Sequence, residues 1–260
     1  MTSQEKLARI REYLDGLEEA VVDEVRPARH GVALLTPSLP LVWQLNALRV
    51  DDPAAGPASL VEEADRVLAG LAHRKLVVHD AELGGRLAGP LAATGWNVLR
   101  LLVMVRDRPA EREVADGSGA EVDRQTGAAG LAAFRREQPF GWQDDAVEQL
   151  AGMDERFDRA ADARDFGSPK AEPACVCRLY SASGLGQIDE VGTVEARRGE
   201  GHASAAVLAA ADVAAAEGRD PIFLLTDAGD WPRHWYATLG FSEIGSVYEF
   251  LKLPMGAAGP

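Results

Sequence analysis

The pattern of hydrophobic and polar positions predicts that helices and strands follow one another along the whole chain. Residues 5–25 and 60–72 carry apolar side chains at three- and four-residue spacing, as amphipathic helices do. Short apolar runs such as 75–78 and 98–105 are typical of strands. The predicted helices are 5–25, 60–72, 81–93, 127–137, 144–159, 201–217 and 231–239, and the predicted strands are 30–35, 75–78, 98–105, 120–122, 174–181, 187–194, 222–226 and 243–252. This alternation indicates an α/β protein with a mixed sheet flanked by helices.

A linker divides this pattern into two parts of comparable size. Residues 106–119 (RDRPAEREVADGSG) combine proline, glycine and charge with little apolar periodicity, so we expect two domains, 1–110 and 111–260. Both parts end alike, because VVHD (77–80), a helix, Gly95-Trp96 and a strand parallel LLTD (224–227), a helix, Gly240-Phe241 and a strand. An internal duplication and a chance match between two common β-α-β patterns both explain this likeness.

Composition and charge narrow the classes of partner. The formal net charge of -14 argues against nucleic acid, which is bound by clustered Lys and Arg, and is compatible with a cationic substrate such as an amine. The N-terminal segment MTSQEKLARIREYL is charged and helical in pattern, unlike a signal peptide, and no segment is long and apolar enough to span a membrane. We therefore expect a cytoplasmic protein without membrane contact. Cys175 and Cys177 form no metal motif and are interpreted as packing residues.

The loop between the predicted strand 187–194 and the helix 201–217 is suited to a phosphate-bearing ligand. Gly199 and Gly201 permit close backbone approach, and the free N–H groups at a helix start attract anions. Two other interpretations are a simple strand-to-helix turn and a dinucleotide fingerprint, Gly199-x-Gly201-x-x-Ser204, with Asp227 at the ribose-binding distance. The fingerprint lacks its third glycine, and too little chain follows Asp227 to complete such a sheet.

The segments around this loop carry a resemblance to a known family. The run RGEGHA (198–203) resembles the R/Q-x-x-G-x-G/A motif of the GCN5-related N-acetyltransferase (GNAT) superfamily. LLTD (224–227), WYATLGF (235–241) and the final strand VYEF (247–250) follow in that family's order and spacing. The close resemblance covers residues 187–251 and extends loosely back to 120. It implies a GNAT-like fold, in tandem if the first half is a degenerate copy without the CoA loop.

The resemblance also implies where acetyl-CoA, the acyl donor, would bind. The main chain of Val191, Gly192 and Thr193 would pair with the pantetheine arm like an added strand. The pyrophosphate would lie on the loop and helix start formed by Arg198, Gly199, Glu200, Gly201, His202, Ala203 and Ser204. Tyr236 matches the tyrosine that protonates the leaving thiolate, although an ordinary helix aromatic facing the core would look the same. No metal is implied.

Two neighbouring acids are candidates for the base that deprotonates the amine. Asp189 and Glu190 lie on the strand before the loop, where related polyamine acetyltransferases carry adjacent acids. Because successive strand residues point to opposite faces, we expect only one of them to face the substrate, with Glu190 slightly favoured. A solvated strand edge is the plainer interpretation of the pair.

Other residues qualify these expectations. Glu200 places a carboxylate in the phosphate loop, which is harmless if turned outward and unfavourable if turned inward, and Gly229 stands where many members have asparagine. Phe140 and Trp142 are the predicted wall of the acceptor pocket, unless they form a hydrophobic staple onto the next helix.

The sequence therefore predicts transfer of an acetyl group from acetyl-CoA to a primary amine, by direct attack in a ternary complex. The alternatives are a non-catalytic acyl-CoA-binding or regulatory protein and a protein or peptide N-acetyltransferase. A small-molecule amine is expected as acceptor before a protein, and assembly as a homodimer is left open.

Overall fold

The computed structural model describes residues 1–111, 119–139, 141 and 143–253. Its helices are α1 (Ser3–Val21), α2 (Pro57–Val67), α3 (Ala81–Ala92), α4 (Arg124–Arg136), α5 (Asp144–Ala160), α6 (His202–Ala216) and α7 (Pro232–Thr238), with short 3-10 turns at Trp43–Leu45 and Glu195–Arg197. Its strands are β1 (Glu24–Ala28), β2 (Gly31–Leu35), β3 (Ala47–Val50), β4 (Arg74–Val78), β5 (Asn97–Arg106), β6 (Ala120–Val122), β7 (Asp162–Ser168), β8 (Cys175–Ala182), β9 (Leu185–Thr193), β10 (Ile222–Asp227) and β11 (Phe241–Lys252). The predicted fold class, a mixed sheet flanked by helices, is confirmed.

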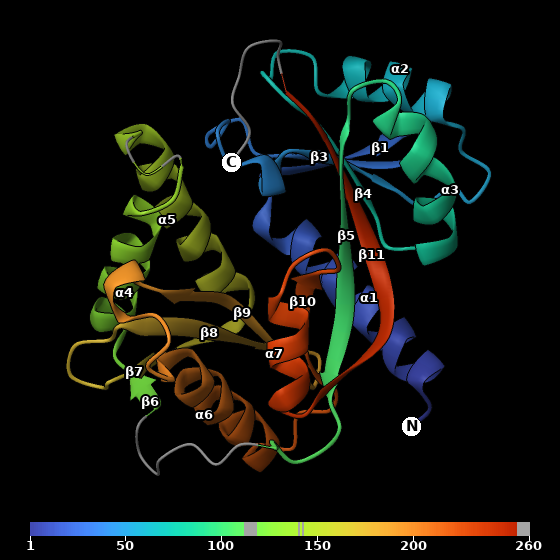
Figure 1. The fold of residues 1–260 in the computed structure, drawn as a ribbon. Helices are drawn as coiled ribbons and strands as arrows, with labels where there is room; N and C mark the ends of the chain where they lie inside the picture. The colour runs from blue at the N-terminus through green and yellow to red at the C-terminus, as the bar shows by residue number, and fades with distance from the viewer. Residues whose placement is uncertain (112–118, 140, 142, 254–260) are drawn as a thin grey trace.

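These strands form one sheet in the order β1-β2-β3-β4-β11-β5-β10-β9-β8-β7-β6. The two long strands at its centre are exchanged between the N-terminal half (residues 1–110) and the C-terminal half (111–260). Strand β11 lies between β4 and β5, and β5 lies between β11 and β10, all antiparallel (Figure 1). Each half therefore supplies a strand that completes the hydrogen bonding of the other.

Helices cover both faces of this sheet (Figure 1). On one face α6 and α7 pack over the C-terminal strands, and α2 and α3 pack over the N-terminal strands. On the other face α1 and α5 share a core with side chains from β5, β8 and β10, and α4 packs beside α5 on β7–β9. Helix α1 belongs to the N-terminal half but contacts α5 of the C-terminal half, so the halves share a core as well as a sheet.

The structure corrects the predicted elements where strands have polar sequences. The helix expected over 5–25 ends at Val21, and Glu24–Ala28 forms the edge strand β1, whose largely exposed residues give no apolar signal. Strands β3 and β7 were not predicted. Both contain a buried charged residue, Arg49 and Asp165 respectively, which disguises the alternation expected of a strand.

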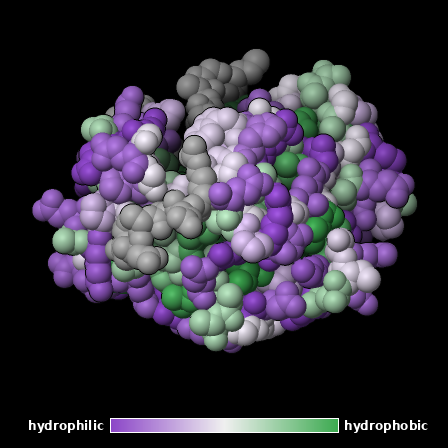
Figure 2. Space-filling model, turned by 60° about the horizontal axis from the view of Figure 1, so that its bottom comes forward, coloured by the Kyte–Doolittle hydropathy of each residue, from purple (hydrophilic) through white to green (hydrophobic). Residues whose placement is uncertain are grey.

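One face of the molecule can be followed in the space-filling view. Figure 2 shows a mainly hydrophilic face with hydrophobic residues visible in scattered patches and recesses. Among the described residues, the large hydrophobic side chains that are exposed are Met1, Val25, Leu41 and Trp231. Within the same part of the chain, none of the helices combines the length and apolar character needed to cross a membrane.

Candidate active site

Strands β9 and β10 part from each other after a short parallel contact. They pair only at Gly186 with Ile222 and at Gln187 with Phe223, whereas β9 pairs with β8 along nearly its whole length. The edge of β9 from Asp189 to Thr193 therefore has no pairing from β10. A strand edge of this kind is where an extended ligand can add as a further strand.

The pairing with β8 shows which main-chain groups face that open edge. The Val194 N–H donates to the Ala174 carbonyl (2.9 Å), so by antiparallel alternation Gly192 also turns its main-chain groups toward β8. The groups of Val191 and Thr193 then turn the other way. The Thr193 carbonyl accepts a hydrogen bond from Arg198 Nε (3.3 Å). Within the described part of the chain, no strand pairs with the Thr193 N–H or with the main-chain groups of Val191 on this side.

The open edge leads to the start of α6. Gly199 and Gly201 have φ of 83° and 87°, left-handed values that favour glycine, and a Cβ atom at either position would meet no heavy atom within 4 Å. Gly201 is the N-cap of α6 and supplies no side-chain cap. The first N–H groups of α6 can therefore bind an anion together with the helix dipole.

Glu200 does not oppose an anion at this helix start. Its carboxylate is half exposed and accepts from Arg197 Nε (2.9 Å) and lies 3.2 Å from His202 Nε2. Arg197, followed by burial and His202, governs its pKa, which lies below the usual value. The negative charge of Glu200 is therefore balanced by its neighbour Arg197 in the same loop. Two more of the predicted residues have protein partners, since His202 Nδ1 lies 3.1 Å from Ser168 Oγ and Ser204 Oγ accepts from Trp235 Nε1 (3.0 Å).

The two candidate bases lie at a β-bulge, and the expected alternation of faces does not hold there. Glu190 has a φ of 52°, and the register between β8 and β9 shifts so that Glu190 and Val191 both oppose Cys177. Glu190 contacts Arg135 on α4. Ile188 belongs to the core on the α6 side of the sheet, so Asp189, the next residue of the strand, lies on the opposite face, where α1, α4 and α5 pack. The two acids therefore lie on the same face of the sheet, although strand alternation predicts opposite faces.

The partners of the two acids differ. Arg135 Nη2 donates to Glu190 Oε2 (3.0 Å), and the same guanidinium makes two hydrogen bonds to Asp154 (2.7 and 2.9 Å). Among the residues that the structure describes, the donors to Asp189 are neutral, the Glu190 N–H (2.8 Å) and Gln187 Nε2 (3.1 Å). Asp189 reaches solvent. Partial desolvation by the surrounding protein, followed by the charge of Glu190, raises the pKa of Asp189 above its usual value, which is the direction that suits a general base.

Tyr236 lies in α7 beneath Trp235 and Phe241, with ring centroids 4.5 and 6.0 Å away. It is 7% exposed, and among the described residues its hydroxyl has no hydrogen-bond partner. Burial and then the neighbouring Cys177 and Asp189 raise its pKa, so the phenol is neutral at physiological pH. Both cysteines are free and buried, in keeping with their interpretation as packing residues.

Solved structures share this architecture. A GCN5-related N-acetyltransferase from Kribbella flavida is 19% identical, with 96% of each chain covered and a TM-score of 0.62. A conserved protein of unknown function from Staphylococcus epidermidis is 15% identical over 90% of this chain and 95% of its own, with a TM-score of 0.65. A GCN5-related N-acetyltransferase from Sphaerobacter thermophilus is 18% identical over 74% of this chain and 64% of its own, with a TM-score of 0.51. The chain has the GNAT fold. No protein-family model matches the sequence, and no curated protein matches it.

Within this GNAT fold, some residues near the parted strands were missed from the sequence. Arg135 resembles an exposed helix cation in the run FRREQ, although Gly127, Leu131 and Arg135 share one buried face of α4, which was a usable signal. Tyr13 comes from α1, more than 160 residues away in the chain, and donates to the Tyr180 carbonyl (3.1 Å). The predicted pocket residues Phe140 and Trp142 lie outside the described residues.

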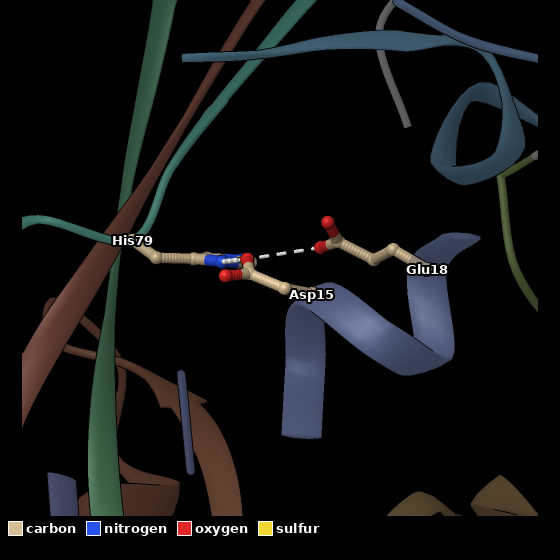
Figure 3. A group of neighbouring side chains, drawn as sticks. All are labelled: Asp15, Glu18 and His79. Carbon is tan, nitrogen blue, oxygen red and sulfur yellow. Dashed lines mark hydrogen bonds and ion pairs between the residues drawn. The ribbon is translucent and has the colours of Figure 1, made fainter. Parts of the chain in front are cut away.

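The N-terminal half of the GNAT fold holds a charged cluster of its own (Figure 3). His79, at the end of β4, contacts Asp15 (2.7 Å) and Glu18 (3.1 Å) on α1 through its two ring nitrogens. Despite the penalty of burial, these carboxylates raise the pKa of His79 to about 9, so the ring is an imidazolium. Arg49 also lies within 3.7 Å of both acids. Because both ring nitrogens and a second cation already serve the carboxylates, we interpret the group as an ion-pair cluster and not as a metal site.

Proposed function

We propose that this protein is an N-acyltransferase that transfers an acetyl group from acetyl-CoA to a primary amine. One observation carries the proposal: beyond the unpaired edge of β9, the loop of residues 194–201 leads to the start of α6, which has no side-chain cap. A pantetheine arm is an extended amide chain attached to a pyrophosphate, so it requires this sequence of an open strand edge followed by an anion site.

The residues present fit such a donor. Val191 and Thr193 offer main-chain groups for the amides of the arm, and Gly199 to Ser204 offer N–H groups for the pyrophosphate. The open space around Gly199 and Gly201 leaves room for the phosphates. Glu200 is neutralised by Arg197, which removes the main objection to cofactor binding that the sequence raised.

The chemistry requires removal of two protons from the acceptor nitrogen and delivery of one to the sulfur. Asp189 takes the first proton from the ammonium form of the acceptor, so that the nitrogen lone pair can attack the thioester carbonyl and form the C–N bond of a tetrahedral intermediate. As the intermediate collapses, the C–S bond breaks and the nitrogen releases its second proton, which restores the proton that Tyr236 gives up. Tyr236 is protonated at neutral pH, so it donates a hydrogen bond and then its proton to the departing sulfur. The structure favours Asp189 over Glu190 as base, because Glu190 is engaged by Arg135.

Calorimetric titration with acetyl-CoA tests the proposal, with NADH as the control for the dinucleotide interpretation. We expect micromolar binding of acetyl-CoA, no binding of NADH, and amine-dependent release of free thiol. Absence of acetyl-CoA binding would refute the proposal. Binding without thiol release on any amine or peptide would identify the non-catalytic alternative, and release with peptides alone would identify a peptide N-acetyltransferase.

A further inference from the structure

Glu190 is held by a buried network of charged side chains. Arg135 is 5% exposed and joins Glu190 to Asp154 on α5. Arg178 on β8 is fully buried and contacts Asp154 (3.3 Å), Asp158 (2.7 Å) and Asp165 (2.9 Å). Since side chains from α4, α5, β7, β8 and β9 all contribute, the Glu190 carboxylate is fixed relative to the rigid part of the fold.

This fixed carboxylate is tied to Asp189 through the main chain. The Glu190 N–H donates to Asp189 Oδ1 (2.8 Å), and Glu190 itself adopts a left-handed φ of 52° at the bulge. A non-glycine residue with this φ is strained and persists only if its surroundings hold it. The ion pair with Arg135 supplies that constraint.

Resting on the proposed function, we propose that Glu190 is a positioning residue: anchored by Arg135, it holds the bulge that orients Asp189 and keeps a negative charge beside it. Asp189 is then the base that accepts the proton, and Glu190 sets the orientation and the electrostatic environment of Asp189. This assignment reverses the preference for Glu190 that the sequence suggested.

Other charged groups affect the pKa of Asp189 less than Glu190 does. Glu249 on β11 also raises the pKa of Asp189, after Glu190, and is itself paired with Lys75 Nζ on β4 (2.9 Å). The remaining titratable groups that sense Asp189 are neutral phenols, Tyr13 on α1, Tyr180 on β8 and Tyr236 on α7. Arg178 is opposite Asp189 in register but is bound to the network acids. Glu190 is thus the chief like charge.

The test is a carbon-detected NMR titration of the Asp189 carboxyl in the free protein, in the wild type, Glu190→Gln and the matched control Glu249→Gln. Glutamine at 190 can still accept from Arg135, so the fold should persist, and melting temperature checks this. We expect the wild-type midpoint to lie above the usual pKa of an aspartate. In Glu190→Gln the midpoint should fall by about 1 pH unit or more, and in Glu249→Gln by much less. Equal midpoints in the wild type and Glu190→Gln would overturn the proposal.

The pH profile of kcat/KM provides the functional readout. The rising limb should follow the titration midpoint, moving to lower pH in Glu190→Gln and disappearing in Asp189→Asn, with a loss of about 100- to 10,000-fold. Loss of activity in Glu190→Gln with retention in Asp189→Asn would make Glu190 the base and refute this inference. The NMR titration does not depend on turnover. Absence of acyl transfer would therefore refute the proposed function without changing the outcome of the titration that tests Glu190.

Discussion

The two halves of the molecule contain a similar unit of strands and a helix. In one half the strand edge of this unit is open, and in the other the matching place is occupied by ion pairs. In each, a parallel strand pair (β3 and β4, or β9 and β10) is followed by a helix and a long strand that crosses to the other half. In the C-terminal half the strand edge is open and Asp189 is exposed to solvent. At the matching place in the N-terminal half, Arg49 and His79 are closed off by acids from α1.

The two halves also differ at the helix that follows the first strand of each pair, α2 after β3 and α6 after β9. Both α2 and α6 begin after a glycine N-cap without a side-chain cap, at Gly56 and Gly201. Before α2, however, the loop carries Asp51 and Asp52, and α2 begins with Pro57, which has no N–H. A helix start is therefore not sufficient for an anion site. The local charge and the number of free N–H groups decide whether a phosphate can bind.

The largest effect should come from separating the halves. Residues 111–260 alone would lose β5, the antiparallel partner of β10, and β11 would lose both of its neighbours. They would also lose α1, which fills the core beside α5. We expect this fragment to show no cooperative unfolding transition by circular dichroism, and co-expression with residues 1–110 to restore it. A fragment that unfolds cooperatively and binds acetyl-CoA would show that the strand exchange is dispensable.

The second prediction compares the two helix starts directly. Gly201→Glu should weaken acetyl-CoA binding by at least about 30-fold, or about 2 kcal/mol, because it places a carboxylate where the pyrophosphate is expected. Gly56→Glu, at the same position of α2, should leave the affinity unchanged. Since Gly201 has a φ of 87°, Gly201→Ala is the control for backbone strain and should lose much less affinity. Equal losses for both glutamate variants would contradict the assignment of the site to α6.

The third prediction compares two buried tyrosines near Asp189, one from each half. Tyr236→Phe should lower kcat about 100-fold with little change in KM, because it removes the proton donor for the sulfur. Tyr13→Phe removes the hydrogen bond to the Tyr180 carbonyl and should cost about 1 kcal/mol of stability with kcat nearly retained. Steady-state kinetics and denaturant unfolding measure the two effects. An unchanged kcat in Tyr236→Phe would leave that residue as an ordinary core aromatic.

The contrast also shows what could be predicted from the sequence. The elements with regular apolar spacing were placed within a few residues, and the strand 120–122 matches β6 throughout. The likeness between 77–80 and 224–227 pointed to the repeated unit. The exchange of β5 and β11 could not be predicted, because the order of buried and exposed positions within a strand does not identify the strand with which it pairs.

The two acids of the candidate site were selected from the sequence, but their geometry could not be predicted from it. Strand alternation assigned Asp189 and Glu190 to opposite faces, and nothing in the sequence marks the left-handed φ of Glu190, a conformation that usually favours glycine. The partner Arg135 lies 55 residues earlier in the chain. Roles that depend on a bulge and on long-range ion pairs follow from tertiary contacts, which local pattern does not encode.

The last prediction tests the ion-pair cluster of the N-terminal half. His79→Gln should destabilise the protein by about 2–3 kcal/mol at pH 7, because the folded protein holds a proton on His79 that the unfolded chain releases more easily. The pKa of His79 is raised to about 9 from 6.5, so its stabilisation is complete below pH 6.5 and disappears as the pH rises through 9. Urea unfolding of wild type and variant at pH 6, 8 and 10 should show a difference that shrinks toward alkaline pH.

His73→Gln is the matched control with the opposite sign. His73 is 1% exposed and its ring lies 2.9 Å from the Asn46 carbonyl, and burial lowers its pKa. Its stabilising contribution is therefore present above pH 6.5 and is lost as the pH falls, because the unfolded chain takes up the proton more readily. The cost of His73→Gln should grow from acid to neutral pH, whereas that of His79→Gln should decline above neutrality. Parallel pH dependences would mean that His79 is a neutral packing residue, and the N-terminal half would then not be closed by charge.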